Sequence, residues 1–448
     1  MTQSLEKRVI RKLTRRIVPF IMLLYFIAYL DRVNIGFAAL TMNEDIGLSA
    51  AAFGFAAGVF FIGYFLFEVP SNLILHRVGA RVWIARIMFT WGIISGATAF
   101  VQGPISLYVL RFLLGAAEAG FFPGIILYLS YWFPARHRAG VTAFFMAAVP
   151  ISIAIGSPIS GALLTMDGVL GLRGWQWLFL VEAAPAVLLT GAVLIYLTDR
   201  PENAKWLDEE ERDWLVAEMK AEETGVAQEH GSQSALRALA NPWVLALALV
   251  YFGTSAGLYT VGIWSPQIIA QHGTGPFATG LINAIPPIFA VLAMVLWSRH
   301  SDRTGERTWH VVFACLFAAA GLVIAAFTSG LMLAVVALIL VSAGVSSSKP
   351  PLWSIPTQFL TGAAAATGIA TINSIGNLGG FAGPFIIGWL RETTGGFRGG
   401  LLIVAATLVF SAALVLLLAE IRKRQMAISQ RHRTASQTSD DYRNLERI

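Results

Sequence analysis

Seven ionisable side chains lie within or at the edge of long apolar stretches of this sequence. They are four acids and three bases, namely Asp31, Glu68, Glu118, Glu182, Arg32, Arg111 and Lys349. A charge at the depth of a bilayer is costly and marks a functional site by default. Acids that exchange protons and bases that hold an anion are the chemistry that this set could perform.

Asp31 and Glu118 each lie about fourteen residues into an apolar stretch, which is mid-depth for a helix that crosses a bilayer. Desolvation there favours the protonated carboxyl group, which suits a residue that gains and loses a proton. Arg111 shares a helix face with Glu118 two turns away, so a pair formed in only some conformations would switch the proton affinity of Glu118. The alternatives are a permanent Arg111–Glu118 ion pair and, for Asp31, a fixed contact between helices.

Arg32 is the candidate anchor for an anionic substrate, because a guanidinium group offers a two-pronged donor to a carboxylate. Tyr25 and Tyr29 lie seven and three residues before it on the same helix face, and their hydroxyl groups could complete the recognition. The alternative is that Arg32 only neutralises Asp31.

Lys349 is a second immersed cation, within the segment Ser346–Pro356. Opposite Arg32 it would favour a substrate with two acidic groups. Alternatively, it extends to the membrane surface or pairs with an acid on the inner side. Gating contacts or packing account best for Glu68, which precedes Pro70, and for Glu182.

The composition excludes several classes of protein. Of 448 residues, 56% are hydrophobic and 13% are charged, whereas soluble proteins are about 25% charged. The single cysteine, Cys315, excludes an internal disulfide framework, and the His spacing does not match a metal-binding motif. Without a GxxxxGK[ST] motif, an ATP-driven pump is excluded. We expect no cofactor, no metal site and no enzyme activity, because no nucleophile–base pair occurs among the immersed residues.

Twelve apolar stretches predict an all-α integral membrane protein with twelve transmembrane helices. They are residues 17–40, 51–75, 82–101, 105–132, 139–166, 175–197, 242–270, 277–298, 309–328, 331–356, 361–390 and 399–421. Six bases between Lys7 and Arg16 precede the first stretch, and further bases gather in alternate connections. This pattern places both termini in the cytoplasm, with the inner membrane as the expected location. It also accounts for the net charge of +6 without nucleic-acid binding.

The two halves of the chain repeat each other at an offset of 226 residues. The loop Arg77-Val-Gly79-Ala-Arg81 matches Arg303-Thr-Gly305-Glu-Arg307, and Pro158 matches Pro384 at the same offset, each between glycines. A duplicated six-helix unit places substrate and coupling sites at the midplane between its halves. The expected organisation is a basic N-terminus (1–16), a first bundle (17–197), a linker with an amphipathic helix (198–240), a second bundle (241–421) and a tail (422–448).

These loops, with Asp302 before the second copy, resemble the loop signature of the major facilitator superfamily. Three further segments are similar to its anion:cation symporter branch, which includes tartrate, phthalate and galactonate permeases. They are the segment from Tyr29 to Ala38, the segment from Arg111 to Gly124 and the segment from Asn373 to Gly380. The resemblance spans nearly the whole chain and implies the major facilitator fold. It does not identify the substrate.

The resemblance also implies roles for individual residues. Acids matching Asp31 and Glu118 couple protons in similar transporters, and the residue matching Arg32 binds substrate. Tyr64 and Asn377 align with cavity-lining residues, and we place Tyr29, Lys349, Trp353 and Asn373 with them as substrate-binding candidates. The loop residues resemble a gating latch between helices: Arg77, Gly79, Arg81, Asp302, Arg303, Gly305 and Arg307. Anchoring by the positive-inside rule is the competing interpretation for the arginines.

The sequence therefore predicts a monomeric secondary transporter that imports a small organic anion with protons by alternating access. A sugar acid, a hydroxy-dicarboxylate such as tartrate and an aromatic carboxylate all fit as substrates, and the other expected partners are protons and the lipid bilayer. Two rivals remain: a proton-antiport efflux carrier, against which Arg32 and Lys349 argue, and a ligand-binding receptor without net flux.

Overall fold

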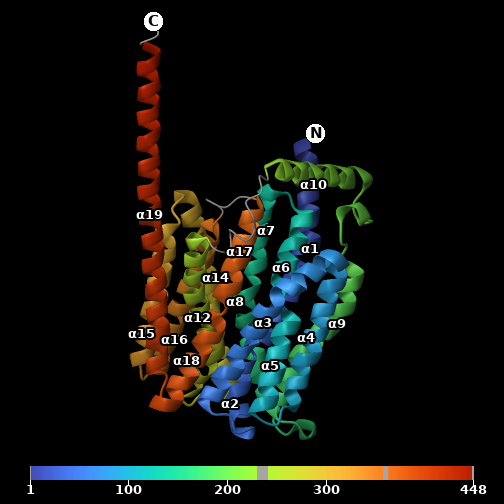
Figure 1. Ribbon diagram of the computed structural model, residues 1–448. Coiled ribbons are helices and arrows are strands. Elements are labelled where there is room, and N and C mark those ends of the chain that lie inside the picture. Colours follow the sequence, from blue (N-terminus) through green and yellow to red (C-terminus); the bar gives the residue numbers. More distant parts are fainter. Residues whose placement is uncertain (1, 230–240, 357–361, 446–448) are drawn as a thin grey trace.

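The computed structural model describes residues 2–229, 241–356 and 362–445, and all of its regular elements in these ranges are helices. The α-helices are α1 (Thr2–Val33), α2 (Ile35–Asp45), α3 (Ala50–Val78), α4 (Ala80–Ala97), α5 (Pro104–Glu118), α6 (Phe121–Trp132), α7 (Ala135–Met146), α8 (Ala148–Leu164), α9 (Gly174–Tyr196), α10 (Glu209–Glu229), α12 (Pro242–Ala270), α13 (Pro276–Asn283), α14 (Ile285–Thr304), α15 (Thr308–Phe327), α16 (Leu331–Ser354), α17 (Gly362–Asn377), α18 (Gly379–Thr394) and α19 (Arg398–Leu445). Figure 1 shows most of them standing side by side, with α10 lying across one end.

Eleven helical stretches in the described ranges are long and apolar enough to cross a membrane. The one remaining predicted span, residues 361–390, consists of two helices of 16 residues each, α17 and α18, which meet at Leu378. Its first residue lies outside the described ranges. The all-helical, many-span prediction is therefore confirmed, with one span divided in two.

Several predicted spans are interrupted where the site residues lie. The first bends at Asn34, between α1 and α2, and the fourth breaks at Ala119 and Gly120, between α5 and α6. Gly120 has a φ of +86°, and a Cβ there would overlap the Ser71 side chain of α3. Glycine is therefore required for both the backbone angle and the close approach. Because of these breaks, Asp31, Arg32 and Glu118 lie beside helix ends.

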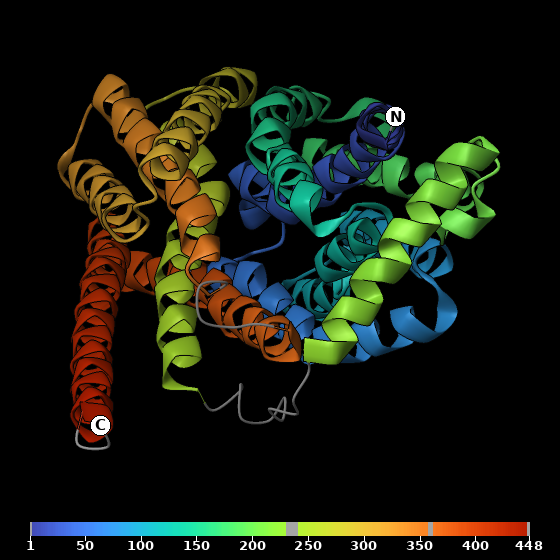
Figure 2. The same ribbon diagram turned by 90° about the horizontal axis from the view of Figure 1, so that it is seen from above.

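The helices form two bundles, which Figure 2 separates by colour into blue-to-green and yellow-to-red groups. They meet along α3 with α18 and along α8 with α13. At both contacts glycines let two backbones approach. A Cβ on Gly54 would lie 2.6 Å from the Pro384 carbonyl oxygen, and a Cβ on Gly161 would lie 2.6 Å from the Pro276 carbonyl oxygen. Gly161, after Pro158, and Gly388, after Pro384, thus lie at the boundary between the bundles, whereas Gly156 and Gly383 pack within their own bundles.

Both termini lie at the same end of the molecule, as an even number of spans requires (Figure 1). The N-terminal segment is not separate, because α1 continues through it into the first span. Its charges pair with α10 and with the start of α7. The nitrogen–oxygen distances are 2.8 Å for Arg8–Glu210, 2.6 Å for Lys12–Glu211, 2.7 Å for Arg136–Glu6, 2.5 Å for Arg136–Glu218 and 2.9 Å for Arg138–Glu222. The linker helix is therefore docked on the first bundle. At the other terminus α19 continues without a break to Leu445, past the predicted start of the tail.

Candidate functional site

An ion pair between Arg32 and Glu118 lies at the centre of the first bundle. Arg32 is 7% exposed and Glu118 1% exposed, and Arg32 Nη2 donates a hydrogen bond to Glu118 Oε1. Arg32 Nη1 donates to the hydroxyl of Tyr259 at 3.0 Å, so the second bundle also contacts this guanidinium group. The sequence did not reveal Tyr259, because an aromatic residue in an apolar stretch is usually a packing residue.

Aromatic rings surround the Arg32 guanidinium group. Its central carbon lies 5.6 Å from the ring centre of Tyr29, 5.3 Å from that of Phe60 and 5.5 Å from that of Tyr64. Ring faces attract a cation at this range and fix its position. The structure thus brings together three of the predicted substrate residues, Arg32, Tyr29 and Tyr64.

Asp31 is buried, with 1% exposure, and faces away from this ion pair toward α4. Its carboxylate accepts hydrogen bonds from Trp91 Nε1 at 2.9 Å and Ser95 Oγ at 3.0 Å, and Asn34 Nδ2 lies at 3.5 Å. Arg32 therefore pairs with Glu118 and does not serve only to neutralise Asp31. The Asp31 contacts do join two helices, as the alternative interpretation expected. Trp91 and Ser95 were missed, although their spacing of four places them on one helix face.

Arg111 does not form the predicted ion pair with Glu118, because Arg32 occupies that carboxylate in this conformation. Arg111 is 1% exposed, and its three guanidinium nitrogens have no hydrogen-bond partner within the described ranges. Its charge lies over the ring of Phe60 at 5.1 Å. The interpretation as a permanent pair is therefore wrong for this conformation. An unpaired buried guanidinium group is unusual and calls for a partner in another state.

Glu68 joins the two bundles. Its carboxylate accepts hydrogen bonds from Asn373 Nδ2 at 2.7 Å and from Ser374 Oγ at 2.6 Å, across from α3 to α17. The contact agrees with the gating role expected for Glu68. It also means that Asn373, a predicted substrate residue, is held by an acid of the other bundle.

The remaining substrate candidates lie on α16 and α17. Lys349 is half-buried, and the described ranges hold no ion pair for it. Trp353 packs edge-on against Tyr251, with ring centres 5.0 Å apart. Asn377 is half-buried at the end of α17. Of these three, Lys349 bears most directly on anion binding.

Glu182 is a fourth buried acid and lies on α9, in the first bundle. Its Oε1 accepts a hydrogen bond from Ser160 Oγ at 2.6 Å, whereas Oε2 has no partner in the part of the chain that the structure describes. This contact joins α9 to α8. It agrees with packing, which the sequence favoured for Glu182.

The predicted gating loops make their contacts within each bundle. Asp199 accepts from the Arg81 backbone N–H at 2.8 Å, and Arg307 Nη1 lies 2.7 Å from Asp302 Oδ1. Gly79 and Gly305 have φ angles of +95° and +67°, which only glycine adopts readily. Arg77 and Arg303 are exposed. A latch formed by these loops between the bundles stays a prediction.

The buried charges are unequally shared between the two repeats. A shift of 226 residues from Asp31, Arg32, Glu68, Arg111, Glu118 and Glu182 leads to Gly257, Leu258, Met294, Ala337, Gly344 and Leu408. The first bundle thus holds the ionisable chemistry. The second contributes Tyr259, Asn373, Ser374 and Lys349 to its surroundings.

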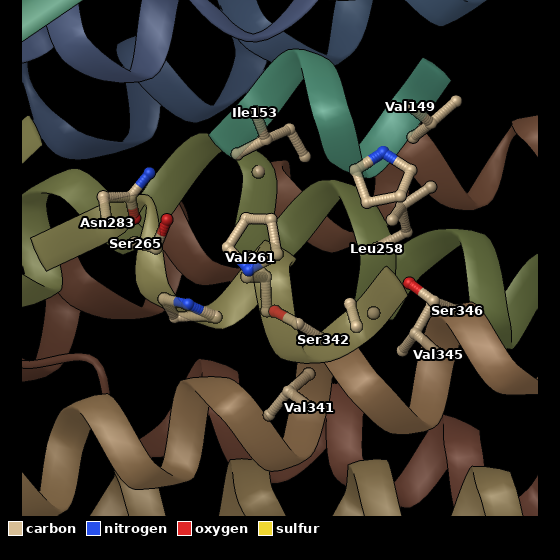
Figure 3. Close-up of a pocket in the computed structure, with 16 residues that line it drawn as sticks. Val149, Ile153, Leu258, Val261, Ser265, Asn283, Val341, Ser342, Val345 and Ser346 are labelled. Atoms are coloured by element: carbon tan, nitrogen blue, oxygen red, sulfur yellow. The ribbon is translucent and has the colours of Figure 1, made fainter. Parts of the chain in front are cut away.

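A partly open pocket elsewhere is distinct from this charged centre. Figure 3 shows it between α8, α12, α14 and α16, with an empty volume of about 470 Å³. Its polar lining side chains are Ser265, Asn283, Ser342 and Ser346, and none of its lining residues is charged. Such a lining does not suit an anion, so we place the candidate site at Arg32.

Known proteins resemble the chain over most of its length. It is 68% identical over 419 residues, which is 94% of this chain and 93% of the relative, to an Agrobacterium vitis protein named "Putative tartrate transporter". It is 42% identical to the "Quinolone resistance transporter" of Acinetobacter baumannii, covering 94% of this chain and 97% of that one. The solved structure of a bacterial homologue of the human lysosomal transporter Spinster has the same fold, with a TM-score of 0.73 at 17% identity, covering 89% of this chain and 95% of the other. The sequence profile of the Major Facilitator Superfamily matches residues 21–384. The chain therefore belongs to the Major Facilitator Superfamily of membrane transporters, as its loop motifs predicted.

Proposed function

We propose that this transporter imports a small organic anion together with protons. The observation that supports it best is the buried Arg32–Glu118 ion pair beside Arg111, a cation without a partner in the described ranges. A carboxylate substrate would compete with Glu118 for the guanidinium group of Arg32. Once released, Glu118 could remain in apolar surroundings only as the neutral acid or by pairing with Arg111. Substrate binding and proton uptake would thereby depend on each other.

Asp31 would hold a second proton. Its carboxylate is surrounded by neutral donors, Trp91 and Ser95, and not by a cation. A buried acid without a cationic partner is a suitable position for a coupled proton. We place the protein in a bacterial inner membrane, with both termini in the cytoplasm.

Tartrate is the first substrate to test. The relatives at 68% identity carry tartrate in their names, and a dianion would match Arg32 together with Lys349. Sugar acids and aromatic carboxylates are the other classes that the cation pair accommodates.

The test uses the purified full-length protein in vesicles that contain a pH-sensitive dye. Tartrate, galactonate, phthalate, hydroxyphenylacetate and sulfoacetate are added outside one at a time. We expect one chemical class to acidify the interior, and we expect Asp31→Asn to abolish this acidification while exchange of labelled substrate continues. Glu420→Gln, a change to an exposed acid on α19, serves as the matched control. Unchanged acidification by Asp31→Asn would contradict the coupling role.

A second candidate function is drug efflux by proton antiport, which the relative named for quinolone resistance favours. Its signature in the same vesicles would be alkalinisation, or expulsion of a quinolone against its gradient. Such a result, with no response to any organic acid, would replace the import proposal.

A further inference from the structure

A basic groove lies at the end of the molecule that carries both termini, far from the candidate site. The bases of α1 from Lys7 to Arg16 line one wall, and Tyr196 and Trp206 line the other. Figure 2 shows this part of α1 at the rim of the molecule beside α10. At about 1.5 Å per residue, Arg15 lies about 25 Å from Arg32 along the helix. The groove is therefore separate from the substrate region.

The bases of the groove fall into two groups. Arg8 and Lys12 form ion pairs with Glu210 and Glu211 of α10. Lys7, Arg11 and Arg15 are exposed, and no ion pair is found for them in the described ranges. These three recur every fourth residue on one helix face, where like charges repel each other. An anion in the groove would remove this repulsion.

The depth of the groove matches the phospholipid headgroups. The first apolar stretch begins at residue 17, so Arg15 and Arg11 lie about 3 and 9 Å beyond it. The polar region of a bilayer extends about 5 to 8 Å beyond the hydrocarbon on each side. Tyr196 ends α9 and, with Trp206, contacts Arg16, whose guanidinium group lies 4.3 and 4.9 Å from their ring centres. Tyr and Trp are the side chains that favour this level of the membrane.

We propose that this groove binds the headgroup of an anionic phospholipid. Arg11 and Arg15 hold the phosphate, and Tyr196 and Trp206 contact the upper part of the acyl chains. With its open side included, the groove has an empty volume of about 1300 Å³, which is ample for a headgroup. The bound lipid would fix α1, the helix that carries Asp31 and Arg32, at the membrane surface.

Native mass spectrometry of the delipidated full-length protein tests the proposal. Phosphatidylglycerol and phosphatidylethanolamine are added in equal amounts, and we expect preferential binding of phosphatidylglycerol. Each base near an anionic headgroup contributes about a fivefold change in affinity, so Arg11→Gln should weaken binding about fivefold and Arg11→Gln/Arg15→Gln about thirtyfold. Arg11→Lys/Arg15→Lys keeps both charges and should retain most of the binding. Size-exclusion chromatography checks the folding of every variant, and the single substitution suffices if the double one does not fold.

Lys423→Gln/Arg424→Gln is the matched control, because it removes two exposed bases of α19 at the same end of the molecule. An equal loss of phosphatidylglycerol in this control would mean general attraction to basic residues and would overturn the site. Displacement of the lipid by millimolar inorganic phosphate would also overturn it, since the groove would then be a site for small anions. Selective loss in the Arg11 and Arg15 variants, without competition by phosphate, supports the proposal.

Discussion

Of the two buried arginines of the first bundle, only Arg32 has a carboxylate partner within the described ranges. Arg32 pairs with Glu118, and Arg111 has no hydrogen-bond partner in the described ranges. A buried ion without a partner costs several kcal/mol, so a state in which Arg111 gains an anionic partner would be favoured relative to this one. A substrate anion on Arg32 would free Glu118 for Arg111. In the proposed mechanism, the two arginines would exchange a single negative charge.

Lys349 should select substrates by charge. It is half-buried and has no ion pair within the described ranges, so a substrate with two acidic groups could neutralise both Lys349 and Arg32. We expect Lys349→Gln to lower the affinity for a dianion such as tartrate at least tenfold, since a charged hydrogen bond contributes about 1.5 to 3 kcal/mol. Monocarboxylates should lose less than about threefold. Competition against labelled substrate in vesicles measures both values.

Lys423→Gln, at an exposed position of α19, provides the control for a lost positive charge. Equal losses for dianions and monocarboxylates in Lys349→Gln would show that Lys349 does not contact the second acidic group.

At the scale of single helices, the sequence predicted which segments are helical far better than where they break. Apolar length identified the spans, because a membrane requires it. The break at Gly120 depends on a contact with Ser71 from another helix, which periodicity cannot reveal. The same limit applied to the site. All the immersed charges were found from sequence, but the choice of Arg32 over Arg111 as the partner of Glu118 depends on how α1 and α5 are rotated.

Hydrogen bonds join the end of α18 to the start of α3. Glu392 Oε2 accepts from Ser49 Oγ at 2.6 Å and from the Ala51 N–H at 2.8 Å. These bonds lower the pKa of Glu392 below its usual 4.5, and the bond from Ser49 has the largest effect. Because the pKa is lowered, these hydrogen bonds are fully formed above the ordinary pKa of a glutamic acid. They are lost only as the pH falls through the lowered value. We therefore do not expect Glu392 to carry the coupled proton.

We expect Glu392→Gln to open this end of the molecule two- to fivefold more often, because it replaces a charged acceptor by a neutral one. Spin labels at Glu44→Cys and Thr393→Cys, both exposed positions, report the opening by electron–electron distance measurement. The pH dependence of transport should not change. A shifted pH profile would assign Glu392 to coupling after all, and Glu420→Gln again serves as the control.

At the scale of the whole molecule, the two repeats differ in the buried charges that they carry. The first bundle holds six of the seven immersed charges, and the second supplies neutral groups and Lys349 around them. The packing between the bundles, in contrast, is symmetric. Gly54 meets Gly388, and Gly280, which lies 226 residues after Gly54, meets Gly161. Duplication thus preserved the glycine contacts between the bundles, whereas the ionisable chemistry is found almost entirely in one copy.

These glycine contacts lie at the end opposite the termini, and closure of that end requires them. A Cβ on Gly280 would overlap the carbonyl oxygen of Ser157 and lie 3.2 Å from the Cα of Gly161. We expect Gly280→Val to keep this end open, because backbone atoms on both sides cannot move away separately. Substrate accumulation should fall below about a tenth of the wild-type value, while the variant still inserts and elutes as a folded protein. Gly191→Val, on α9 with no atom within 4 Å of the added Cβ, should transport normally. If Gly280→Val also accumulates substrate at the wild-type rate, this end does not close through the α8–α13 contact. The alternating movement must then use a different contact between the bundles.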